Sequence, residues 1–157
     1  MRRARRWSDA RRRLASDAGS ASLEFLTVGV LLLVPLVYLV LVVSALQAAS
    51  LGLEGAARQA SRVFVQAETE PAARGAAERA IRVTLADYGL EAADAEVAIS
   101  CRPDPADCLL RRGFVTVEIA TRVPLPLAPP VLGLDVPLSV TVQAIATEQV
   151  SRFRAGP

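Results

Sequence analysis

The chain has 157 residues, of which 52% are hydrophobic and 22% are charged, and it contains no histidine. Its formal net charge of +2 is unevenly spread, because residues 1–19 hold seven arginines against two aspartates. This length allows one small domain beside a membrane segment. The lack of histidine excludes Ser-His and Cys-His catalysis, and no GxxxxGK or HExxH motif occurs. We therefore expect no enzyme, cofactor or metal site.

The basic head has two possible explanations, nucleic-acid binding and membrane orientation. Arginines bind phosphates electrostatically, but the only aromatic residue among them is Trp7. The apolar run that follows favours the second explanation, because arginine-rich flanks of a membrane span stay in the cytoplasm. We expect no nucleic-acid partner. The arginines are Arg2, Arg3, Arg5, Arg6, Arg11, Arg12 and Arg13.

The run from Phe25 to Leu46, FLTVGVLLLVPLVYLVLVVSAL, carries no charge. As a helix it is about 33 Å long, close to the bilayer hydrocarbon core of about 30 Å. It predicts a single membrane span, with the N-terminus inside and the residues from about 47 onward outside. Pro35 lacks the N–H that pairs with the carbonyl of Leu31, so we expect a kink there.

Other interpretations of this run fit less well. Buried core helices and the apolar regions of cleaved signal peptides are usually shorter. RRRL at residues 11–14 is similar to a twin-arginine export signal, but Asp17 and Glu24 interrupt the approach to the apolar run.

Small residues dominate the stretch after the span. Apolar residues three or four apart from Gln47 to Val65 predict that the membrane helix continues outside the bilayer. Pro71 suits the start of a second helix and Gly89 its end. The predicted inner faces are Ala49, Leu53, Ala57, Ala60 and Phe64 in the first helix, and Ala77, Ile81, Leu85 and Tyr88 in the second.

From Ala95 the apolar period changes to two. AEVAISC, GFVTVEIATRV and LSVTVQAIATEQV alternate as half-buried strands do, which predicts a small antiparallel three-stranded sheet. The proline-rich PLPLAPPVLGLDVP between the last two predicts a long extended connection. The expected fold class is α+β. We divide the chain into a basic cytoplasmic leader (1–19), a transmembrane and extended helix (20–65) and an extracytoplasmic α+β domain (66–157).

Cys101 and Cys108 bracket RPDPAD, a turn-forming segment that can bring two strand ends together. An oxidising exterior favours a disulfide between them over two free thiols. Two cysteines without histidine do not complete a zinc shell. We interpret Asp104 and Asp107 as turn residues of this loop.

The stretch GSASLEF, residues 19–25, places a glutamate just before the span. With the basic leader and the apolar run, it resembles the type IV prepilin signature. The resemblance implies that a membrane prepilin peptidase cuts after Gly19 and leaves Ser20 as the new N-terminus. Glu24 is then the fifth mature residue, the position where pilins carry a glutamate that sets subunit registration.

Within that class, GSASLEF, Pro35 and the later AARQASR resemble TadE-like minor pseudopilins of the tight-adherence (Tad, or Flp) pilus family. Phe25 stands where major Flp pilins usually carry tyrosine, which favours a minor role. The implied partners are the prepilin peptidase, other pilin-like subunits, a Tad-type membrane platform and the lipid bilayer. The implied location is the cytoplasmic (inner) membrane, with incorporation in a surface fibre left open. The alternative is an uncleaved, signal-anchored protein that presents an extracytoplasmic binding domain.

Overall fold

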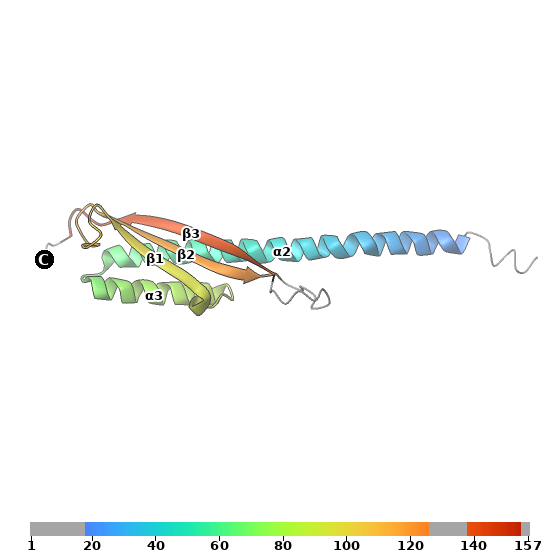
Figure 1. The fold of residues 1–157 in the computed structure, drawn as a ribbon, viewed down its shortest axis with the longest axis horizontal. Helices are drawn as coiled ribbons and strands as arrows, with labels where there is room; N and C mark the ends of the chain where they lie inside the picture. Colours follow the sequence, from blue (N-terminus) through green and yellow to red (C-terminus); the bar gives the residue numbers. More distant parts are fainter. Residues whose placement is uncertain (1–17, 126–137, 155–157) are drawn as a thin grey trace, which may run out of the picture. The chain divides into compact units, whose positions relative to one another are not determined.

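The computed structural model describes residues 18–125 and 138–154, with side chains described from residue 22 onward. Residues 1–17 of the predicted leader (1–19) and most of the proline-rich connection, residues 126–137, lie outside the described residues. The chain divides into two compact units, Met1–Val40 and Leu41–Pro157. The helix α2, Ala18–Gln66, runs through the boundary between them (Figure 1).

The first half of α2 is the apolar segment. From Ser22 to Leu41 the side chains are exposed on every side of the helix, with Tyr38 partly covered. An apolar helix that buries no side is suited to lipid or to neighbouring apolar helices rather than to water. It is the one helix of the described residues that is long and apolar enough to cross a membrane. The chain is thus a candidate single-pass membrane protein.

The second half of α2 forms the core of the second unit. The face predicted from sequence is confirmed, because Ala49, Leu53, Ala57, Ala60 and Phe64 are all buried. The unit begins at Leu41, so it includes part of the predicted helical segment 20–65. The small side chains on this face allow α2 to approach its neighbours closely.

The helix α3, Glu70–Asp87, has a defined start and end. The side-chain oxygen of Thr69 accepts a bond from the backbone N–H of Ala72, and Pro71 lies in the first turn as predicted. At the other end, Leu90 donates its N–H to the carbonyl of Leu85 and Gly89 to that of Ala86. Gly89 has a φ of +69°, which glycine adopts without steric cost.

The inner face of α3 is largely as predicted. Ala77, Ile81 and Leu85 are buried, together with Ala73. Tyr88 is 44% exposed, because it follows the last helical residue. Its ring nevertheless lies against Gly52 of α2.

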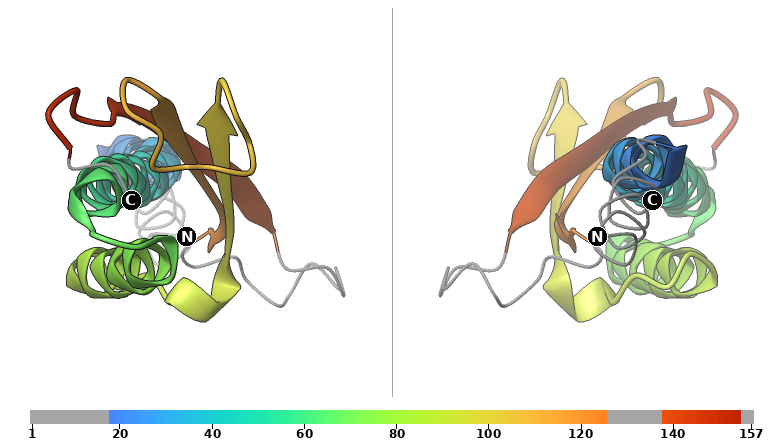
Figure 2. Two further views of the ribbon diagram at one scale, coloured as in Figure 1. Left: turned by 90° about the vertical axis from the view of Figure 1, so that its left-hand side faces the viewer. Right: turned by 90° about the vertical axis from the view of Figure 1, so that its right-hand side faces the viewer.

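The three predicted strands form one antiparallel sheet in the order β1-β2-β3. After the short helix η1, Ala92–Asp94, come β1, Ala95–Arg102, β2, Phe114–Pro124, and β3, Ser139–Gln149. The sheet covers one side of α3 and of the second half of α2 (Figure 2). Val115, Val117 and Ile119 of the central strand point into this interface and are fully buried. The α+β fold class is confirmed.

Candidate functional site

The residues of the predicted cut site and the predicted registration charge belong to one helix. α2 begins at Ala18, so Gly19, Ser20 and Glu24 follow one another within its first two turns. Positions 20 and 24 are four residues apart, which places them on the same face about 6 Å apart along the axis. Glu24 is exposed, and it takes part in neither of the ion pairs found among the described residues.

The helix beyond Glu24 leaves few polar groups unsatisfied. The hydroxyl of Thr27 donates to the carbonyl of Leu23 at 2.7 Å, so this side chain needs no water. Gly29 has open space where a side chain would lie. Pro35 lies inside the helix but does not end it, since α2 continues to Gln66. Its ring removes one backbone hydrogen bond and weakens the helix locally.

A carboxylate at the edge of such a segment has a specific chemical use. An unpaired charge next to an apolar bundle is costly, so Glu24 favours a cationic partner. Opposite charges about 4 Å apart at an effective dielectric constant near 20 attract by about 4 kcal/mol before desolvation is subtracted. This arrangement can hold two chains in one register.

The second feature is the disulfide between Cys101 and Cys108. The bond is present, with a Cα–Cα distance of 5.1 Å, and both cysteines are buried. Within the loop, Asp104 Oδ1 accepts from Ala106 N at 2.9 Å and Asp107 Oδ1 accepts from Leu109 N at 3.1 Å. The aspartates therefore form turns, as predicted. Among the described residues no group of three potential ligands gathers around a metal position.

Arg112 connects this loop to β3 and was not singled out by the sequence. Its φ of +62° is unusual for a residue with a side chain. Its N–H donates to the carbonyl of Val150 at 3.2 Å, and Gln149 Nε2 donates to its carbonyl at 3.3 Å. These bonds fix the disulfide loop against the end of the sheet.

Arg154 was also missed, because its partners lie more than eighty residues earlier. Its guanidinium donates to the carbonyl of Glu68 at 2.7 Å and to that of Val65 at 3.4 Å. A cation at the C-terminal end of a helix stabilises free carbonyls there. The last described residues are thus fixed to the end of α2.

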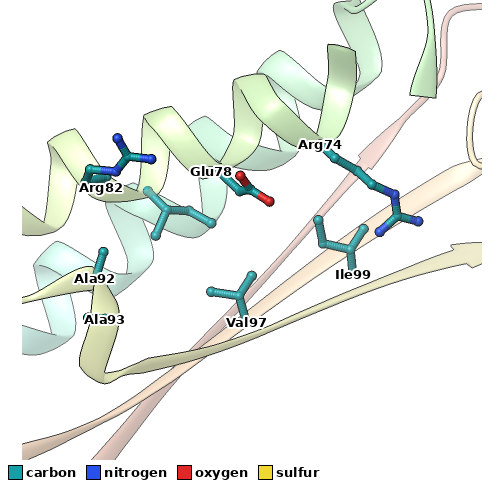
Figure 3. A pocket seen from close by; sticks show the side chains of 8 residues that line it. Arg74, Glu78, Arg82, Ala92, Ala93, Val97 and Ile99 are labelled. Carbon is teal, nitrogen blue, oxygen red and sulfur yellow. The ribbon is translucent and has the colours of Figure 1, made fainter. Parts of the chain in front are cut away.

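A groove of about 510 Å³ lies between α3 and β1 (Figure 3). Arg74 and Glu78 extend from the helix, and Val97 and Ile99 form the opposite wall. Arg74 is paired with Glu70 at 2.7 Å, so the positive charge of Arg74 is already balanced. The described lining has no serine, threonine or cysteine, and it offers charged and apolar contacts only. It consists of Arg74, Glu78, Ile81, Arg82, Ala92, Ala93, Val97 and Ile99.

Comparisons of the chain with protein-family models, with curated proteins and with solved structures found no match. The candidate site is therefore defined by the chain's own residues. It consists of Gly19, Ser20 and Glu24 at the start of α2, followed by the apolar half of the same helix.

Proposed function

We propose that the chain is a TadE-like minor pseudopilin. A prepilin peptidase cuts after Gly19, and the mature protein acts in the assembly of a Tad/Flp-type pilus or secretion fibre. One observation carries the proposal: Gly19, Glu24 and the charge-free segment Phe25–Leu46 follow one another in a single helix. A glutamate that only bordered a membrane span would not account for the glycine five residues before it.

Cleavage gives Glu24 a function. It creates an α-amino group on Ser20 and makes Glu24 the acceptor for the corresponding amine of an adjacent subunit. A wrong register leaves the carboxylate unpaired in an apolar bundle, so the pair aligns subunits more than it strengthens their contact. The exposed glutamate at the edge of the apolar segment supports this role.

The two halves of α2 support an assembly protein rather than an enzyme. The first half exposes apolar side chains all round, which suits packing in the bilayer or among pilin-like helices. The second half forms part of the core of the α+β unit. In this proposal the arginine-rich head faces the cytoplasm, and the α+β unit lies outside the inner membrane. The Cys101–Cys108 disulfide fits an oxidising exterior.

The test is to express the full chain with and without its cognate prepilin peptidase and to determine the N-terminus by mass spectrometry. We expect the peptidase to produce a chain that begins at Ser20. Gly19→Leu should block the cut, because the bulky side chain occupies the residue on the leader side of the bond. Gly29→Leu is the matched control, since Gly29 lies in the same helix with open space around it. This variant should be cut normally.

Two results contradict the proposal. One is an intact leader in the presence of an active peptidase, which favours the alternative of an uncleaved, signal-anchored protein that presents a binding domain. The other is a cut that persists in Gly19→Leu, which assigns the processing to another protease.

A further inference from the structure

The end of the sheet where β2 stops and β3 starts is apolar. Its last paired positions are Val123 with Val140 and Pro124 with Ser139. Beyond them, Leu125 donates its N–H to the carbonyl of Leu138 at 2.9 Å. Of the described residues in the two strands, Arg122 is the charged one nearest this end.

The helices do not cover this end. Leu138 is 42% exposed and Val140 39%, although Val140 points to the same side of the sheet as Ala144, which is 6% exposed. The middle of β3 is packed against the helix layer, whereas the start of the strand extends past it. Within the part of the chain that the structure describes, two large apolar side chains are thus left partly exposed at one edge of the unit.

This edge lies at the end of the second unit where α2 enters it. In Figure 1 the start of β3 and the end of β2 reach further than β1 and α3 do toward the end of the unit where α2 enters it. The α2 residues at this end belong to the apolar run, and Leu41 and Val43 are each 42% exposed. The partly exposed strand ends and the last apolar turns of the helix therefore lie at the same end of the unit.

We propose that this edge, formed by Leu125, Leu138 and Val140, is a second membrane contact that rests in the interfacial layer of the bilayer. The bilayer is the favoured occupant because the apolar run of α2, which requires it, leaves the unit at the same end. Burial of the leucine and valine side chains favours contact with lipid. The proposal depends on the membrane span and not on cleavage at Gly19.

The charged residues next to the edge indicate which lipid head groups the proposed contact requires. Arg122 is exposed and lies one position before Val123, where its guanidinium can reach lipid phosphate groups. Asp94 and Glu96 lie beside Arg122 around a shared pocket. These acidic groups offset its charge, so the contact does not require anionic lipid. Zwitterionic phosphatidylcholine is the appropriate probe.

The test uses tryptophan fluorescence of the full chain in phosphatidylcholine vesicles with brominated acyl chains, which quench only nearby indoles. Trp7 is the native tryptophan, so the background carries Trp7→Phe. Leu138→Trp places the probe in the proposed contact. Ile145→Trp is the matched control, because Ile145 is an apolar β3 residue that is 59% exposed on the opposite face of the sheet.

We expect brominated lipid to quench the fluorescence of a tryptophan at position 138, and iodide in the water not to quench it. At position 145 we expect iodide to quench the fluorescence and brominated lipid not to. Equal responses at the two positions overturn the proposal. Iodide quenching at 138 overturns it too, since the edge then faces water. Shielding at 138 from both quenchers also overturns it, because protein then covers the edge in place of lipid. All three results leave the outcome of the Gly19 cleavage test unchanged.

Discussion

At the scale of single residues, two glycines of α2 have different neighbours. A Cβ added at Gly52 would lie 2.8 Å from Cγ of Tyr88 and 3.0 Å from its Cβ. These atoms are next to the backbone of Tyr88 and cannot move far without moving α3. A Cβ added at Gly55 would meet Cγ2 of Thr84 at 3.5 Å, an ordinary contact. Gly52 is thus a close-approach position and Gly55 is not.

We predict opposite effects for alanine at these two positions. Gly55→Ala should raise the free energy of unfolding by about 0.5 to 1 kcal/mol, because alanine has the higher helix propensity. Gly52→Ala should lower it by about 1 kcal/mol, since overpacking costs more than the propensity gain. Urea unfolding of the full chain in detergent micelles measures both. A stabilised Gly52→Ala variant would mean that Tyr88 moves aside freely.

The residues that the sequence predicted well are those whose position follows from spacing alone. Leu53 and Phe64 repeat at helical intervals, so their shared face could be derived without knowing what covers it. Arg154 could not be derived, because its acceptors at Val65 and Glu68 are brought near only by the completed fold. Arg112 adopts its positive φ because bonds to Gln149 and Val150 hold it there. Local sequence carries no signal for such contacts.

At the scale of elements, the disulfide loop connects β1 to β2 and also contacts the end of β3. Its closure restricts the unfolded chain, and the buried sulfurs pack among the core residues of the unit. Because the closure term increases with loop length, this short loop lies at the lower end of its range. The bond should therefore stabilise the unit without being the main source of its stability.

We predict that reduction lowers the free energy of unfolding by about 2.5 kcal/mol, the chain-entropy value for a loop of this length. Urea unfolding with and without reductant measures the difference. The control is the double variant Cys101→Ala and Cys108→Ala, which should not respond to reductant. A wild-type chain whose unfolding is unchanged by complete reduction would contradict the chain-entropy account for this loop.

The groove between α3 and β1 is an element-scale feature that the sequence did not predict. Its walls come from residues that each follow an ordinary amphipathic pattern, such as Ile81 and Ile99. The opening between them depends on the spacing of the helix and the strand, which the pattern of either element does not specify. The strand limits themselves were predicted to within a residue or two, because the period-2 alternation ends at turn residues.

At the scale of the whole chain, α2 belongs to both units. The sequence predicted one continuous helix over residues 20–65 and a separate domain that begins at residue 66, where that helix ends. The compact unit begins at Leu41 instead, and its core contains Leu53, Ala57 and Phe64 of α2. The sheet has one face to bury, and α3 alone is too narrow to cover all three strands. The second half of α2 supplies the missing part of that layer.

This dependence predicts how fragments behave. A fragment of residues 41–157 keeps both helices of the layer and should unfold cooperatively in urea. A fragment of residues 67–157 lacks Phe64 and Leu53, so Val115, Val117 and Ile119 are left partly uncovered and the sheet should not fold. Near-ultraviolet circular dichroism and urea unfolding of the two fragments, both with the disulfide formed, distinguish these states. Cooperative unfolding of 67–157 would mean that α3 and the sheet form a complete domain, with α2 as an anchor attached to it.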